Sequence, residues 1–127
     1  MGIAIVCVGA GAALPLALMA ANADNAKADA VGGIVLTSAQ INGRQLFAAN
    51  CSNCHTLKAT NSVAQTGPNL DVLRPPENLV LNAIETGRAR GIGNMPAGLL
   101  SGKDAKDVAN FVAAVAGHGE GVTTQAP

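Results

Sequence analysis

Cys51-Ser52-Asn53-Cys54-His55 is the stretch of sequence that decides the fold. Two thiols three positions apart, followed at once by an imidazole, suit the covalent attachment of haem. The thiols add to the vinyl groups of the porphyrin, and the imidazole then reaches the iron from one side. The motif therefore predicts one c-type haem, bound through Cys51 and Cys54, with His55 as an iron ligand.

Two other kinds of site use a close pair of thiols. A thioredoxin-like dithiol needs a surrounding βαβ pattern, which the sequence does not show. A four-ligand zinc site needs a second pair of Cys or His nearby. The only other His is His118, in a Gly-rich tail, and the third Cys is Cys7, which fits an ordinary small residue of an apolar stretch better than a lipid attachment site. Haem is the favoured interpretation.

Met95 is predicted to be the second iron ligand. It is the only Met after Met19, and it lies in Gly93-Asn94-Met95-Pro96-Ala97-Gly98, a segment too rich in turn residues for a core helix. Methionines that only fill the core usually lie in periodic apolar runs. A thioether is a soft ligand that favours reduced iron and raises the potential.

The segment Gly67-Pro68-Asn69-Leu70 lies twelve residues after His55. A turn there can place a backbone carbonyl beside the free N–H of the imidazole, which fixes the ring and makes it a better ligand. An ordinary Gly-Pro loop is the alternative. Beside the haem motif, Pro68 and Asn69 are assigned to the cofactor site.

Positive side chains downstream could serve the haem propionates, because an Arg can make paired hydrogen bonds to a carboxylate. A solvated side chain is the alternative for each of them. Asn94 could also donate to a propionate. The candidates are Arg74 and Arg88, with Arg90 as a third.

The composition of the 127 residues is poor in aromatic bulk, with no Trp or Tyr and two Phe. So small a domain has difficulty building a core from its own side chains, which a large apolar cofactor would relieve. The net charge is zero, with eight basic and eight acidic residues. Nothing therefore suggests nucleic-acid binding, which needs a basic stripe.

Helical periodicity predicts an all-α domain of three or more helices around the haem. The first helix begins at Thr37 or Ser38, where Thr37 and Gln40 form a capping box. Gly43 allows a close approach by another helix, and Phe47 packs beside it. The face of this helix comprises Gly43, Leu46, Phe47 and Asn50.

Two further helices follow. One starts after Arg74-Pro75-Pro76 and stops at Gly87, with Leu79, Val80, Ala83 and Ile84 as its buried stripe. The last has Ser101 as N-cap with Asp104 three residues on, and it ends at Gly117. Its apolar face carries Val108, Phe111, Val112 and Val115. A contact between Phe47 and Phe111 is expected, and strand alternation is confined to residues 32–36.

The N-terminal segment carries no charged side chain in residues 1–21, and it predicts an additional apolar helix. Residues 1–23 are either an export signal or a retained membrane anchor. Both interpretations place the domain in the periplasm or on the outer face of the cytoplasmic membrane. Residues 24–36 are predicted to be a linker, 37–117 the haem domain and 118–127 a flexible tail.

The order of these motifs resembles that of the class I, mono-haem cytochrome c domains of bacteria. The resemblance implies His55/Met95 ligation, a low-spin six-coordinate haem, crossed first and last helices, and transfer through an exposed haem edge. The chain lacks the Tyr or Trp that the family often has near the propionates, which leaves the propionate partners open. The pieces that carry the resemblance are Gly43-x-x-x-Phe47, Cys51-x-x-Cys54-His55, Gly67-Pro68-Asn69-Leu70, Ala83-Ile84-Glu85-Thr86-Gly87-Arg88, Met95-Pro96 and Phe111.

The expected function is single-electron transfer, as a carrier or as a subunit of a respiratory or photosynthetic chain. Redox proteins are the expected partners, with a larger membrane complex as an option and membrane contact through residues 1–21. The alternative is a haem enzyme, or a haem domain that binds a gas or peroxide, with an open iron position. No residue has the pattern of a catalytic group, and neutral charge favours docking through an apolar rim.

Overall fold

The computed structural model describes residues 15–16, 30–31, 33–89 and 93–118. Its helices are α2 (Ser38–Asn50), α3 (Leu70–Leu73), α4 (Glu77–Thr86) and α5 (Gly102–Val115). Two antiparallel pairs of two-residue strands join them, β1 (Ala30–Val31) with β2 (Ile34–Val35) and β3 (Thr56–Leu57) with β4 (Ser62–Val63), and the 3-10 helix η1 (Lys58–Thr60) lies between β3 and β4. The expected all-α class is confirmed for this part of the chain.

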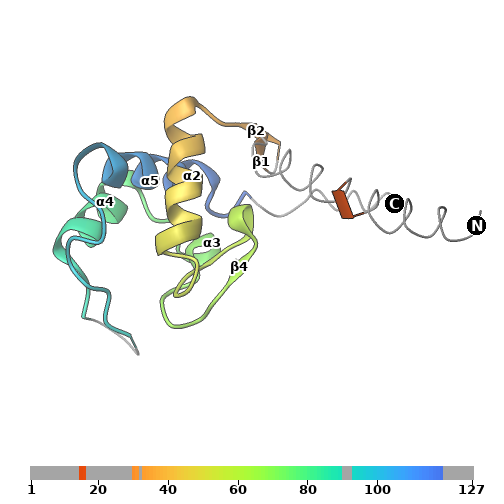
Figure 1. Cartoon of the computed structure of the whole chain (residues 1–127). Helices are drawn as coiled ribbons and strands as arrows, with labels where there is room; N and C mark the ends of the chain where they lie inside the picture. The colour runs from red at the N-terminus through yellow and green to blue at the C-terminus, as the bar shows by residue number, and fades with distance from the viewer. Residues whose placement is uncertain (1–14, 17–29, 32, 90–92, 119–127) are drawn as a thin grey trace, which may run out of the picture.

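Helices α2 and α5 cross in close contact, as Figure 1 shows. Gly43 makes the crossing possible, because a Cβ atom there would lie 2.1 Å from the carbonyl oxygen of Asp107. One turn further on, the rings of Phe47 and Phe111 meet edge to face, with centroids 6.3 Å apart and planes at 61°. Both the close approach at Gly43 and the Phe47–Phe111 contact are confirmed.

Helix α5 supplies most of the core, because its apolar side chains recur at helical spacing. Its expected face is buried throughout, and α4 packs against it. On α4 only Ile84 is buried, and Val80 is half-buried. The prediction that Leu79 is buried is wrong: it is 41% exposed, because it lies about 140° around the helix from Ile84, the residue of α4 that is buried in the core.

The helix ends follow most of the sequence signals. Thr37 and Gln40 form the expected capping box, with Gln40 N–H donating to Thr37 Oγ1 at 3.3 Å and Thr37 N–H donating to Gln40 Oε1 at 2.9 Å. Gly87 ends α4 with φ of +72°. Ser101 occupies the N-cap position of α5, but its hydroxyl makes no capping hydrogen bond.

The segment before α2 packs against the core. Leu36 is buried, and Val31 and Ile34 of the β1–β2 hairpin contact the core cluster. The predicted apolar N-terminal helix and leader lie almost wholly outside the described residues, as do most of the linker and the tail beyond His118. Among the described helices, none has the length and apolar content needed to cross a bilayer.

Candidate functional site

The two thiols of the motif lie on one turn at the C-terminal end of α2. Cys51 is the C-cap residue of this helix, and its N–H donates to the Phe47 carbonyl at 2.8 Å. The N–H groups of Cys54 and His55 both donate to the Cys51 carbonyl, each at 3.0 Å. Both thiols are free, with Cys51 buried and Cys54 exposed.

The environment of the Cys51 thiol does not favour a reactive thiolate at this position. Burial, and secondarily the proximity of Cys54, raises the pKa of the Cys51 thiol to about 11. A reactive dithiol needs a thiolate with a lowered pKa. The described residues contain no cluster of three or more Cys, His, Asp or Glu able to hold a metal ion.

The imidazole of His55 is oriented by the chain segment opposite it. Its Nδ1 atom lies 3.0 Å from the carbonyl oxygen of Pro68. A carbonyl oxygen only accepts, so Nδ1 carries the proton and Nε2 keeps a lone pair for a metal. Gly67 lies against the same ring: a Cβ atom there would be 2.6 Å from Cε1 of His55. Pro68 thus supplies the carbonyl expected from this turn.

Asn69 is engaged within the chain. Its Oδ1 accepts hydrogen bonds from the N–H of Asp71 at 2.9 Å and of Val72 at 3.3 Å, which makes it the N-cap of α3. Its backbone also forms a parallel bridge with Thr56, next to the imidazole. In this structure Asn69 therefore orders the turn that carries the Pro68 carbonyl.

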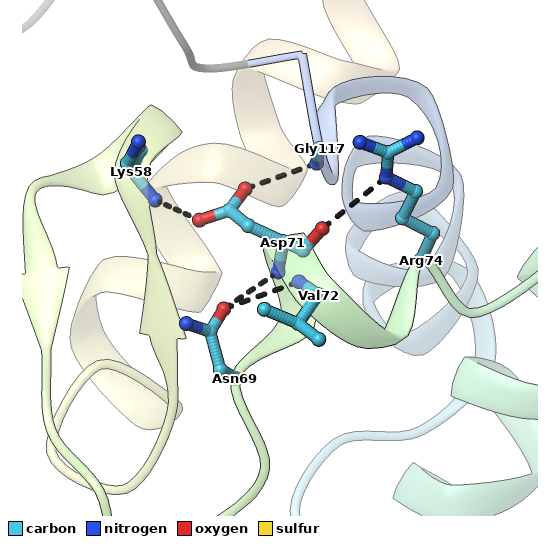
Figure 2. A pocket seen from close by; sticks show the side chains of 6 residues that line it. All are labelled: Lys58, Asn69, Asp71, Val72, Arg74 and Gly117. Atoms are coloured by element: carbon cyan, nitrogen blue, oxygen red, sulfur yellow. Dashed lines mark hydrogen bonds between the residues drawn. The ribbon is translucent and has the colours of Figure 1, made fainter.

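Asp71 is a buried carboxylate that the sequence analysis missed. Its Oδ2 accepts from the N–H of Lys58 at 2.8 Å, and its Oδ1 accepts from the N–H of Gly117 at 3.0 Å (Figure 2). It joins the segment after the haem motif to the end of α5. No sequence pattern marks this role, because both partners are backbone groups far from it along the chain.

The two described arginines assigned to propionates occupy different places. Arg74 has a left-handed backbone with φ of +46°, and its Nε donates to the Asp71 carbonyl at 3.3 Å, beside Gly117 in Figure 2. Arg88 directs its guanidinium back to the C-terminal end of α4. Arg90 lies outside the described residues.

Met95 is held by a short antiparallel bridge with Arg88. The Arg88 N–H donates to the Met95 carbonyl at 2.9 Å, and the Met95 N–H donates to the Arg88 carbonyl at 2.7 Å. The side chain is half-buried and packs against the core cluster. In Figure 1 the stretches after α4 and before α5 run side by side to the lower end of the molecule, and the segment that follows α2 also turns at this end.

The residues present fit a covalently bound haem. Two free thiols lie on one turn, the Nδ1 atom of the adjacent imidazole is engaged with a carbonyl so that Nε2 is left for a metal, and the backbone of Met95, which carries the thioether, is held by pairing with Arg88. Cys51 and Cys54 would hold the porphyrin, and His55 would ligate its iron. The donor set of imidazole and thioether suits iron in an electron-transfer site.

Comparison with known proteins gives the same picture. The family model described as cytochrome C oxidase, cbb3-type, subunit III matches residues 38–112. Cytochrome c6 from Microcystis aeruginosa is 39% identical over 80 residues, which cover 61% of this chain and 98% of that protein. The crystal structure of the c-type cytochrome SorU from Sinorhizobium meliloti aligns with a TM-score of 0.55 and 37% identity, over 62% of this chain and 92% of that one.

Proposed function

This chain belongs to the class I cytochrome c family, and from that premise we propose that it transfers single electrons through one haem c with His55 and Met95 as axial ligands. Cytochromes of this family carry covalently bound haem, and Cys51 and Cys54 have the required spacing. The matched region contains both cysteines and both proposed ligands. When bound, the haem supplies a one-electron couple at its iron.

The observation that carries the proposal is the hydrogen bond between His55 Nδ1 and the Pro68 carbonyl at 3.0 Å. It fixes the tautomer and the orientation of the ring, and it makes Nε2 a more basic ligand. Because Gly67 packs against the ring, the imidazole has little room to rotate. A ligand held in this way changes little when one electron is gained or lost.

Met95 supports a carrier in preference to an enzyme. A haem enzyme needs an open iron position, whereas a second axial ligand closes it. Both the N–H and the carbonyl of Met95 are hydrogen-bonded to Arg88, so its thioether starts from a fixed point on the chain. A thioether ligand raises the potential, which suits an acceptor of electrons from membrane or periplasmic donors.

We further propose that the protein acts outside the cytoplasm and exchanges electrons with redox proteins. It would do so as a carrier or as a subunit of a respiratory or photosynthetic complex, exported or anchored through residues 1–21. The description of the matching family model, an oxidase subunit, supports the second form. Recovery of the native protein in the soluble fraction alone would overturn the anchored form.

The axial ligands are tested by the visible spectrum of the oxidised protein. We expect the weak band near the red end of the spectrum that marks Met–iron ligation. Met95→Leu removes the sulfur at similar volume and should abolish this band, whereas Leu99→Met, at an exposed neighbour, should leave it unchanged. A wild-type spectrum without the band would overturn the carrier mechanism in favour of an open iron position.

The attachment is tested by the mass of the denatured protein. We expect a mass increase of one haem in the wild type and its loss in the variant with both Cys51→Ser and Cys54→Ser. Cys7→Ser serves as the control and should keep the haem. Retention of haem by the double variant under denaturing conditions would show that these thiols do not attach it.

A further inference from the structure

The guanidinium of Arg88 is directed back to the C-terminal end of α4. Its Nη1 donates to Thr86 Oγ1 at 3.0 Å and to the Gly87 carbonyl at 2.8 Å, and its Nη2 donates to Asn82 Oδ1 at 2.8 Å. Thr86 is itself fixed, because its hydroxyl donates to the Asn82 carbonyl at 2.7 Å. We propose that Arg88 is a positioning residue that clamps Met95 to the end of α4, and not a partner of a haem propionate.

The clamp acts through the backbone. The main chain of Arg88 exchanges both hydrogen bonds with Met95, at 2.9 Å and 2.7 Å, which is the closely hydrogen-bonded arrangement of an antiparallel pair. The guanidinium anchors one member of this pair to α4, so the other member is anchored as well. The backbone of Met95 is therefore held in place relative to α4 through Arg88.

Two further contacts tie the same segment to α4. Gly87 passes so close to the segment that a Cβ atom there would lie 2.7 Å from the Met95 carbonyl oxygen. Beyond the ligand, the Gly98 N–H donates to the Ile84 carbonyl at 2.9 Å. The C-terminal turn of α4 thus holds the chain on both sides of Met95, and Arg88 supplies the only charged group among these described contacts.

The C-terminal end of α4 also favours a positive charge, whether or not a haem propionate lies nearby. The last carbonyls of a helix carry partial negative charge, and Arg88 lies just beyond the last residue of α4 while donating to the Gly87 carbonyl. A propionate contact would have to compete with three hydrogen bonds already made inside the chain. The guanidinium orientation is therefore explained by α4 alone.

The proposal rests on Met95 ligation, and its test measures the affinity of the oxidised protein for added imidazole, which competes with the thioether. Arg88→Lys keeps the positive charge but loses the planar guanidinium with its several N–H donors. Asn82→Ala removes the side-chain acceptor of Arg88 Nη2 at an exposed position. We expect each variant to bind imidazole about tenfold more tightly than the wild type, and to show a weaker red band.

A matched control removes one hydrogen bond from the other end of α4. Asn110 Nδ2 donates to Glu77 Oε2 at 3.0 Å, so Asn110→Ala should lower stability without changing imidazole affinity. A propionate role for Arg88 predicts a different pattern, with the midpoint potential shifted by Arg88→Lys while imidazole affinity stays at the wild-type value in both variants. That pattern would overturn the clamp.

The experiment distinguishes failure of Met95 as an iron ligand from failure of the role proposed for Arg88. A wild-type protein without the red band would remove Met95 as a ligand, and the clamp would fall with it. A wild-type protein with the band, together with unchanged imidazole affinity in Arg88→Lys and Asn82→Ala, would overturn the clamp alone. Equal gains in affinity for Asn82→Ala and Asn110→Ala would also overturn it, because they would reflect general loosening.

Discussion

The imidazole of His55 and the carbonyl of Pro68 form a hydrogen bond of 3.0 Å across twelve intervening residues. The segment between them returns through the β3–β4 hairpin and is fixed at Gly67, whose N–H donates to the Cys54 carbonyl at 2.6 Å. The thiol-bearing turn and the carbonyl that orients the imidazole are thus tied together directly. The geometry of the proposed ligand depends on how closely this segment approaches the ring.

Gly67→Ala should disturb that geometry. The new Cβ atom would lie 2.6 Å from Cε1 of His55, so the ring must move away from the Pro68 carbonyl. A weaker hydrogen bond makes the imidazole a poorer donor to oxidised iron, and we expect the midpoint potential to rise. A loss of about 1 kcal/mol corresponds to about 40 mV for one electron. Redox titration measures the shift.

Gly102→Ala is the control for this prediction. Nothing lies within 4 Å of a Cβ atom at Gly102, although its φ of +57° makes the substitution strained. We expect a lower melting temperature and an unchanged potential. A potential unchanged in both variants would show that the approach of Gly67 does not set the ligand geometry.

Gly43→Ala should destabilise the whole domain. Its Cβ atom would lie 2.1 Å from the carbonyl oxygen of Asp107, which is helix backbone and cannot rotate away. Helices α2 and α5 would have to separate, at a cost of about 3 kcal/mol or more. Denaturant unfolding followed by circular dichroism measures the loss. Gly33→Ala, with open space and φ of +80°, should cost only about 1–2 kcal/mol, and an equal loss in both would contradict the packing argument.

Local and periodic features of this fold are the ones that the sequence predicts correctly. The Thr37–Gln40 capping box needs only residues three apart, and the buried face of α5 follows from its repeat. Gly43 and Phe47 mark a close helix crossing because a missing side chain and a ring one turn apart leave a clear pattern. Such features need no knowledge of what lies opposite.

Features that depend on distant partners are not predictable in the same way. Strands β3 and β4 have two residues each, too few to show alternation. Leu79 belongs to an apolar stripe on α4, and only the packing against α5 decides that Ile84 is buried and Leu79 is not. From the sequence, Arg88 is a candidate partner of a haem propionate or a solvated side chain, and its hydrogen bonds to Asn82 and Thr86 become visible only in the structure.

The buried carboxylate of Asp71 gives a further prediction. Both of its oxygens accept backbone N–H groups, from Lys58 and from Gly117. In Asp71→Asn the amide nitrogen would face one of these donors, so one buried N–H loses its acceptor. We expect a loss of about 1–3 kcal/mol. Hydrogen exchange should quicken at the Lys58 or the Gly117 amide.

Asp104→Asn provides the comparison for Asp71, since Asp104 is exposed in the first turn of α5. It should cost a few tenths of a kcal/mol at most, through the helix dipole. Equal stability of the two variants would mean that the Asp71 hydrogen bonds do not hold the segment after the haem motif to the end of α5.

Acid stability should depend on Asp107. Two hydrogen bonds hold the pKa of this carboxyl below its ordinary value of 3.8. The one from Lys103 has the larger effect, and the one from Asn42 has the smaller. A lowered pKa means that the contribution to stability is complete above that value and is lost as the pH falls below it. Asp107→Asn should therefore flatten the acid limb of a plot of unfolding free energy against pH.

The relative contributions of Lys103 and Asn42 can be tested on the acid limb of the same plot. Lys103→Met should reduce the acid dependence more than Asn42→Leu, because the lysine also attracts the carboxylate through its charge. The Lys103 side chain is 76% exposed, so added salt should weaken its effect and leave that of Asn42 in place. Lys106→Met, at an exposed lysine of the same helix, is the matched control. An acid limb that Lys106→Met flattens as much as Lys103→Met does would show that net charge, and not the contact with Asp107, governs acid stability.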